Sequence, residues 1–126
     1  MMLCIKRSPK ELVSGVEEDR PVMSLVSGAP GTATPDTFPR LLLQHAAVRP
    51  DAPALREKYL GIWQSWTWRQ TATEVREMAM GLASLGFRRG DNLAIIGDNR
   101  PRLYMAFAAA QSLGGVAVPM YQDAVA

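Results

Sequence analysis

The sequence predicts an α/β fold, with a hairpin and a parallel strand-helix-strand unit that form an incomplete subdomain. Residues 93–96 are a continuous apolar run, typical of a parallel strand buried on both faces. Residues 103–113 then give a helix that is apolar nearly all round, and residues 116–120 give a second strand. Such a crossover is expected to be parallel and right-handed.

Composition and charge limit the functional classes. The 126 residues are 48% hydrophobic and 21% charged, which fits one globular domain of ordinary size. The net charge is only +2. Acidic residues interrupt the basic ones everywhere except at Arg88 and Arg89, so the chain has no clustered basic face and we expect no nucleic-acid partner.

The number of cysteines and the length of the apolar runs indicate where in the cell the protein is expected to be. Cys4 has no internal disulfide partner, so a reducing, cytoplasmic location is expected. Every apolar run is well below the ~18 residues of a spanning helix. Arg88 and Arg89 could touch an acidic membrane at about 1 kcal/mol each, but a solvent-exposed turn is the preferred interpretation. Membrane association is therefore expected to be peripheral at most.

Residues 1–36 are expected to form a disordered tail and linker, and residues 37–126 the folded part. Residues 1–26 lack a sustained hydrophobic period, and residues 27–37 are rich in Gly, Pro, Ser and Thr. Met23 lies just before the linker, which gives the hypothesis that it is an alternative translation start. N-terminal sequencing of the native protein tests this, and a terminus at Met1 or Met2 contradicts it.

The folded part is predicted to open with a helix and a hairpin. Asp36 or Thr37 caps the helix, Pro39 lies in its first turn and Pro50 ends it. One face carries apolar residues and the histidine: Phe38, Leu41, Leu42, His45 and Val48. Residues 54–58 and 63–67 then alternate as strands around a turn at Leu60 and Gly61.

A second helix is predicted from a capping box. Thr67 and Gln70 have the required spacing, and Gly86 supplies the C-terminal stop. The predicted core face recurs every three to four residues: Trp68, Ala72, Val75, Met78 or Ala79, Leu82 and Leu85.

The last two connections are marked by glycine and proline. Residues 88–91 turn the chain into the strand at 93–96. Asn99 is the expected cap of the following helix, with Pro101 in its first turn. Gly114 and Gly115 end that helix.

Individual candidates for chemistry each have a simpler structural interpretation. His45 is the only histidine and has no nearby Cys, so packing is preferred over a ligand or base role. Asp98, Asn99 and Arg100 precede a helix where an anion could bind. They lack a glycine cradle and Asp98 repels phosphate, so capping is preferred.

Aromatic, turn and methionine residues are interpreted in the same way. Tryptophans near Lys58 and Arg69 could stack on nucleic-acid bases, but packing in the hairpin and the core is preferred. These tryptophans are Trp63, Trp66 and Trp68. Gly90 and Asp91 are expected to shape a turn. Four methionines are expected to fill gaps in the core: Met78, Met80, Met105 and Met120. No catalytic, cofactor-binding or metal-binding residue is predicted.

The order of these features resembles the N-terminal part of the AMP-forming adenylate enzymes, which include acyl-CoA synthetases, luciferases and peptide-synthetase adenylation domains. The resemblance covers residues 37–126. It is carried by Leu41, Leu42, Pro50, Asp51, Ala52, Pro53, Ala54, Trp66, Thr67, Trp68, Gly81, Leu82, Leu85, Gly86, Gly90, Asp91, Asn99, Arg100, Pro101, Gly114, Gly115 and Pro119. Residues 61–63 and 121–123 are similar to the long-chain fatty acyl-CoA synthetase branch.

The resemblance implies a two-step ligase reaction. A carboxylate attacks the α-phosphate of ATP to give an acyl-adenylate, and the thiol of coenzyme A then displaces AMP, with magnesium neutralising the phosphates. The family's phosphate loop, nucleotide segment, ribose-binding Asp and catalytic Lys have no counterpart before Ala126. The 126-residue chain alone is therefore expected to bind none of ATP, Mg and coenzyme A, and to be inactive. Arg102 and Tyr104 depart from the family, which usually has an acidic residue and a Trp there.

Two alternatives remain open. The chain is either part of such a ligase or a stand-alone, non-catalytic interaction module derived from the fold. The strand at 116–120 has no following helix to cover it, which favours the first. Within the superfamily, the acid is either a long-chain fatty acid or an aryl, short or amino acid.

Overall fold

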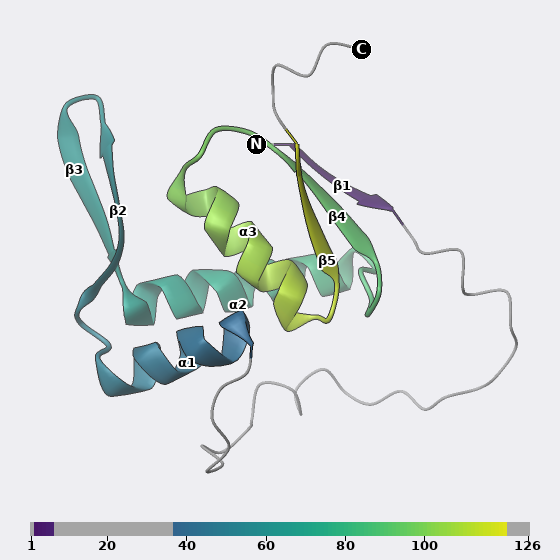
Figure 1. Ribbon diagram of the computed structural model, residues 1–126, viewed down its shortest axis with the longest axis horizontal. Helices are drawn as coiled ribbons and strands as arrows, with labels where there is room; N and C mark the ends of the chain where they lie inside the picture. Colours follow the sequence, from purple (N-terminus) through teal and green to yellow (C-terminus); the bar gives the residue numbers. More distant parts are fainter. Residues whose placement is uncertain (1, 7–36, 121–126) are drawn as a thin grey trace, which may run out of the picture.

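The computed structural model describes residues 2–6 and 37–120, which form two sheets and three helices (Figure 1). The elements in chain order are β1 (Met2–Lys6), α1 (Phe38–Val48), β2 (Pro53–Tyr59), β3 (Ile62–Thr67), α2 (Trp68–Ser84), β4 (Asn92–Ile96), α3 (Pro101–Ser112) and β5 (Val116–Met120). The predicted α/β class, the hairpin and the parallel pair are all confirmed.

The larger sheet has the order β1-β4-β5, with β4 in the centre (Figure 1). β4 and β5 are parallel, and Asn92 lies opposite Val116 while Ile96 lies opposite Met120. Helix α3 connects these two strands and packs against both of them. Pro119 lies in β5, an edge strand among the described residues, where a missing backbone N–H is tolerated.

β1 corrects the prediction that residues 1–36 form a disordered tail and linker. Met2–Lys6 pair antiparallel with β4, so that prediction is wrong for these five residues. The partner of this short run lies about ninety positions later, and local periodicity cannot reveal it. Met23 itself lies outside the described residues, so the alternative-start hypothesis stays a prediction. The predicted linker at 27–36 lies outside the described residues.

β4 is buried mainly on one face, not on both as predicted. Leu93 and Ile95 are fully buried, whereas Asn92, Ala94 and Ile96 are only half-buried. Along β5, Val116, Val118 and Met120 are exposed. Side chains alternate across a sheet, so one face packs on the helices and the other carries uncovered apolar residues.

Helix α1 lies at the surface, and its predicted apolar face is only partly packed. Thr37 is the N-cap, as predicted, but its side chain makes no capping hydrogen bond to the described residues. Phe38 is 74% exposed and Val48 is 76% exposed, and no residue of α1 is fully buried. Leu42 alone of its large apolar residues packs against the core. A narrow strip of α1 that includes Leu42 therefore packs against α2 and α3.

The hairpin is closed by a two-residue turn in which both residues have positive φ. Leu60 has φ 47° and Gly61 has φ 81°. This is the pattern of a type I′ turn, which matches the twist of the flanking strands. Glycine adopts it readily, whereas Leu60 is strained there.

Helix α2 begins with the predicted capping box. The Gln70 N–H donates to Thr67 Oγ1 at 3.2 Å, and the Thr67 N–H donates to Gln70 Oε1 at 2.9 Å. The fully buried residues are Thr71, Val75, Ala79 and Leu82. Leu85 was predicted on this face but is exposed, because it is the C-cap and the chain then turns at Gly86 with φ 86°.

Helix α3 is largely buried, as predicted, but its N-cap is Arg100 and not Asn99. Pro101 follows in the first turn, where its missing N–H costs nothing. The Asn99 side chain instead accepts a hydrogen bond from the Tyr104 hydroxyl at 2.5 Å. The fully buried residues are Pro101, Met105, Ala106, Ala109 and Ala110.

Two turns meet where α3 leads into β5. The Gly90 N–H donates to the Gly114 carbonyl at 3.0 Å, and the Val116 N–H donates to the Asp91 carbonyl at 2.8 Å. A Cβ on Gly115 would overlap the Phe87 ring and lie 3.0 Å from the Asp91 carbonyl oxygen. Close backbone approach therefore requires glycine at position 115.

Replacing Gly115 with alanine tests this close approach. We expect Gly115→Ala to lower the free energy of unfolding by about 2 kcal/mol, because Phe87 must move out of the core. Gly81→Ala is the matched control. Position 81 lies in α2 with open space around it, so alanine should raise stability by about 0.5–1 kcal/mol. Equal free energies of unfolding for the two variants, measured by urea denaturation, would contradict the interpretation.

A second pair of variants tests the capping box. Thr67→Ala leaves the Gln70 N–H without its acceptor and should cost about 1 kcal/mol of stability. Thr73 donates its hydroxyl to the Arg69 carbonyl inside the helix and caps nothing, so Thr73→Ala should be within about 0.5 kcal/mol of the unmodified chain. The same denaturation measurement compares them, and a loss as large for Thr73→Ala would rule out a specific capping effect.

Candidate functional site

The described residues hold no cluster typical of a catalytic or metal centre. Within residues 2–6 and 37–120, no group of three His, Cys, Asp or Glu residues could hold a metal ion. In the same ranges no helix has the length and apolar character needed to cross a bilayer. The chemistry-bearing side chains are therefore considered one by one.

Asp91 is a buried carboxylate, and it shapes a turn as predicted. Its Oδ2 accepts a hydrogen bond from the Arg88 N–H at 2.8 Å, and its own N–H donates to the Arg88 carbonyl at 3.1 Å. Gly90 has φ 87°, which lets the chain reverse between them. These hydrogen bonds give the Asp91 carboxylate a structural role in the turn.

His45 lies against an aromatic ring, which agrees with the packing role expected for it. Its ring centroid is 4.5 Å from that of Trp68, with the planes tilted by 45°. The guanidinium of Arg49 lies 5.2 Å from the Trp68 ring centroid. The half-buried Trp68 ring thus packs against the C-terminal end of α1 and connects this end to the start of α2.

The segment before α3 forms internal pairs. Arg100 Nε lies 3.4 Å from Asp98 Oδ2, and another Arg100 nitrogen lies 3.9 Å from the Glu57 carboxylate. Tyr104, one of the two departures from the family pattern, donates to Asn99 across the first turn. The other departure, Arg102, is exposed. Asp98 and Asn99 thus support the loop, and Arg100 links it to the hairpin.

The three tryptophans do not form one stacking surface. Trp66 packs against the core, Trp68 packs on His45, and Trp63 is exposed near the hairpin turn. Lys58 lies opposite Trp63 in the strand register, and Arg69 pairs with Asp51 at 3.2 Å. Core packing is confirmed for Trp66, whereas Trp68 packs on α1, and Trp63 lies in the hairpin with its ring exposed.

Among the methionines expected to fill core gaps, burial differs widely. Met105 is fully buried and Met78 packs against the core, in agreement with the prediction. Met80 and Met120 are exposed, so the prediction is wrong for them. Met80 lies on the outer side of α2, and Met120 lies on the uncovered face of β5.

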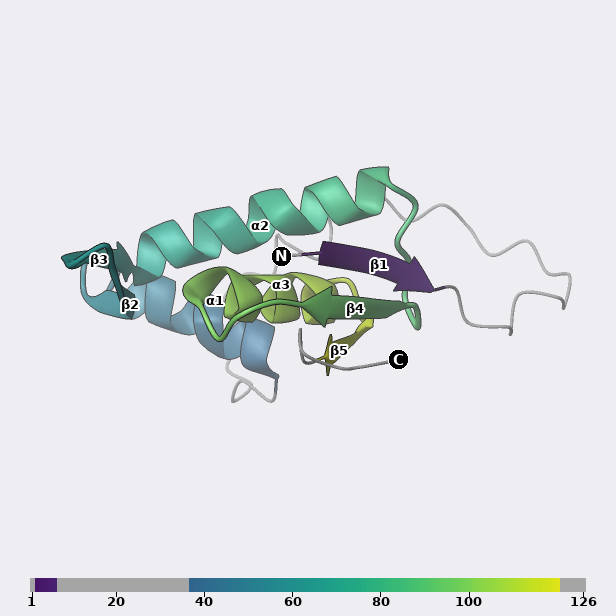
Figure 2. The ribbon, with the colours of Figure 1, turned by 90° about the horizontal axis from the view of Figure 1, so that it is seen from above.

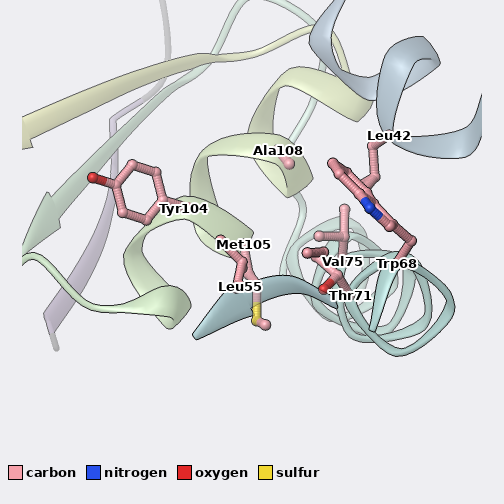
Figure 3. A pocket seen from close by; sticks show the side chains of 9 residues that line it. Leu42, Leu55, Trp68, Thr71, Val75, Tyr104, Met105 and Ala108 are labelled. Atoms are coloured by element: carbon pink, nitrogen blue, oxygen red, sulfur yellow. The ribbon is translucent and has the colours of Figure 1, made fainter. Parts of the chain in front are cut away.

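A small apolar pocket lies where α1, the hairpin, α2 and α3 meet (Figure 3). Its volume is about 150 Å³, and its walls include Leu42, Leu55, Val75 and Met105. Thr71 supplies a hydroxyl, which donates to the Thr67 carbonyl at 2.8 Å. The lining is predominantly apolar and the volume is small for a ligand site, so we interpret the pocket as a packing gap.

A larger groove of about 870 Å³ runs between the start of α1, the middle of α2 and the end of α3. Leu41, Ala72 and Leu113 contribute apolar walls, and Arg76 and Arg89 contribute cationic groups. Sequence reasoning missed both hollows. Each is made by three or more separate elements, and no local pattern encodes how these elements meet.

The described residues do not fit an ATP–magnesium site. The N-terminus of α3 has no glycine cradle, and Asp98 and Arg100 there already pair with each other. No carboxylate cluster is available to hold the metal among residues 37–120. No reaction step is therefore assigned to these residues.

Comparison with known proteins identifies the family to which this fold belongs. A family model described as AMP-binding enzyme matches residues 42–126, from α1 through β5. The chain belongs to this family. Its members are AMP-binding enzymes by description, which implies the use of ATP by the parent enzymes.

Similar sequences include proteins of differing description. Uncharacterized protein Rv1549 of Mycobacterium tuberculosis H37Rv is 39% identical over 90 residues, which are 71% of this chain and 50% of that protein. Long-chain-fatty-acid–CoA ligase FadD15 of Mycobacterium bovis is 29% identical over 72% of this chain and 15% of its own length. The 2-succinylbenzoate–CoA ligase of Bacillus pumilus is 35% identical over 60% of this chain and 15% of its own length. The chain thus spans half or less of these relatives.

Solved structures match the fold in the same way. The crystal structure of IdnL1 superimposes with a TM-score of 0.67 at 26% identity, over 76% of this chain and 20% of that one. The N-terminal subdomain of Klebsiella oxytoca NpsA superimposes with a TM-score of 0.63 at 25% identity, over 70% of this chain and 22% of that one. The mixed α/β arrangement therefore matches N-terminal subdomains of adenylate-forming enzymes, as the sequence predicted.

Neighbouring alanines on α3 test whether the small pocket is a packing gap. Ala108 lines the pocket, so Ala108→Leu should fill it and raise the free energy of unfolding by about 1 kcal/mol. Ala109 is fully buried and does not line it, so Ala109→Leu should overpack the core and cost about 2 kcal/mol or more. Urea denaturation of both variants makes the comparison, and destabilisation by Ala108→Leu would contradict a simple gap.

Proposed function

We propose that this chain is the N-terminal portion of an ATP-dependent, AMP-forming ligase. The proposed ligase activates a carboxylic acid as an acyl-adenylate and transfers the acyl group to coenzyme A, with Mg²⁺ neutralising the phosphates. The observation that carries the proposal is the family match over residues 42–126, which includes the whole strand-helix-strand unit. The superposition on the N-terminal subdomain of Klebsiella oxytoca NpsA, with a TM-score of 0.63 at 25% identity, supports an N-terminal position in the proposed ligase.

A long-chain fatty acid is the proposed substrate. FadD15 of M. bovis, a long-chain-fatty-acid–CoA ligase by name, is 29% identical to this chain over 91 residues, which supports this choice. The 2-succinylbenzoate–CoA ligase match favours the alternative of an aryl acid. The family that the chain resembles builds its acid pocket from later residues, so the choice between acids depends on the complete polypeptide.

The 126-residue chain alone is proposed to be inactive. The family's phosphate loop and catalytic Lys have no counterpart in it, and Asp91, His45 and Asp98 have structural contacts. Within residues 37–120, no element covers the apolar face of β5 formed by Val116 and Val118, which supports the ligase portion over a stand-alone interaction module. Such a module would be expected to shield this face.

Location is proposed to be cytoplasmic. The single cysteine cannot form a disulfide within the chain, so folding does not depend on an oxidising compartment. The proposed substrates ATP and coenzyme A are cytoplasmic metabolites.

ATP–pyrophosphate exchange tests the inactivity of the purified chain. We expect no exchange above background with long-chain fatty or aryl acids, because the chain lacks the groups that hold the triphosphate. FadD15 of M. bovis, a complete relative, serves as the positive control under the same conditions. Exchange by the 126-residue chain that depends on added acid would refute this part of the proposal.

The mass of the native product tests the parent-enzyme proposal. An antibody against residues 67–90 should detect a species several times heavier than 13.8 kDa in the source cells. Acid-dependent exchange activity should co-purify with that species. A stable product of 13.8 kDa without any such activity would instead favour the non-catalytic module.

A further inference from the structure

The tip of the β2–β3 hairpin carries a group of exposed apolar side chains at one extremity of the molecule. The hairpin projects from the helices, with its turn at the far end (Figure 1), and it lies at one end of the body (Figure 2). Leu60 is 83% exposed, Ile62 69%, Trp63 60% and Tyr59 45%. These four residues are called the hairpin tip below.

Leu60 is the least expected of these residues. It occupies the first central position of a type I′ turn, with φ 47°, where asparagine, aspartate or glycine is favoured. Leucine there is both strained and exposed, and its side chain gains no burial in return. This combination points to a contact outside the described part of the chain.

Cationic groups lie immediately behind the tip. The Arg56 guanidinium is 5.2 Å from the Trp63 ring centroid, and Lys58 lies opposite Trp63 in the register. The Arg100 guanidinium is 5.2 Å from the Tyr59 ring centroid. Each aromatic ring of the tip therefore has a cation beside it.

Glu57 and Asp98 both pair with Arg100, so the positive charge behind the tip comes from Arg56 and Lys58. Glu57 lies 3.9 Å from Arg100 and is largely buried, with 22% of its side chain exposed. Arg56 and Lys58 are exposed on the opposite face of the hairpin. An apolar end followed by two exposed cations, Arg56 and Lys58, is complementary to an anionic bilayer surface.

We propose that the hairpin tip inserts into the headgroup region of an anionic lipid membrane. Leu60 and Ile62 enter the acyl boundary, and Trp63 and Tyr59 take the interfacial position that these amphipathic rings prefer. Arg56 and Lys58 face the lipid phosphates. Four side chains are few for a specific protein interface, which needs about 800 Å² on each partner, whereas shallow membrane insertion needs no more.

Co-sedimentation of the full 126-residue chain with lipid vesicles tests the proposal. We expect binding to phosphatidylcholine vesicles that contain phosphatidylserine, and weaker binding to phosphatidylcholine alone or in high salt. Leu60→Asn is the decisive variant, since Asn-Gly is a favoured type I′ sequence and the hairpin should fold at least as well. Its vesicle partition coefficient should fall by about tenfold.

Matched variants separate the two parts of the surface. Leu85→Asn removes an equally exposed leucine at the C-terminal end of α2, far from the hairpin in the sequence, and should leave the partition coefficient unchanged. Lys58→Gln should lower binding to anionic vesicles by about fivefold and change binding to neutral ones little.

Three results would overturn the proposal. The first is no sedimentation with anionic vesicles, and the second is equal partition of Leu60→Asn and the unmodified chain. The third is sedimentation without vesicles that Leu60→Asn abolishes, which would make the tip a protein contact. The inference does not depend on the ligase reaction, so any of these results leaves the proposed function standing.

Discussion

The contact between two turns, one before β4 and one before β5, sets the geometry on which the sheet depends. Gly90 and Gly114 are joined by a backbone hydrogen bond, and the next bond, from Val116 to the Asp91 carbonyl, begins the parallel ladder. Phe87 occupies the space that a side chain at Gly115 would need. Because both strands start from this point, their register and the position of α3 above them follow from one close backbone approach.

Several charged residues of the described chain hold its loops and helix ends in place. Asp91 closes a turn, Arg100 bridges the α3 loop to the hairpin, and Arg49 lies over Trp68. These contacts give the charged groups a structural role in the described part of the chain. The AMP-binding family match therefore identifies ancestry and architecture more directly than it identifies a reaction for these residues.

Most of the fold could be predicted from the sequence because its signals are local. The capping box at Thr67, the glycines at 86 and 114 and the hairpin turn all act within a few residues. What could not be predicted depends on distant partners: the pairing of β1 with β4, the exposure of Phe38 and the one-sided burial of β4. The pockets and the cation beside each tip aromatic were missed for the same reason, since they arise only where separate elements meet.

The strand order β1-β4-β5 has a directional consequence for assembly. β1 occupies one edge of the central strand β4, so any further strand must join this sheet beyond β1 or beyond β5. Growth beyond β5 follows the order of synthesis on the ribosome, and each new parallel strand would find a template already formed. A strand added beyond β5 would therefore take its register from β5, whose own register is set by β4.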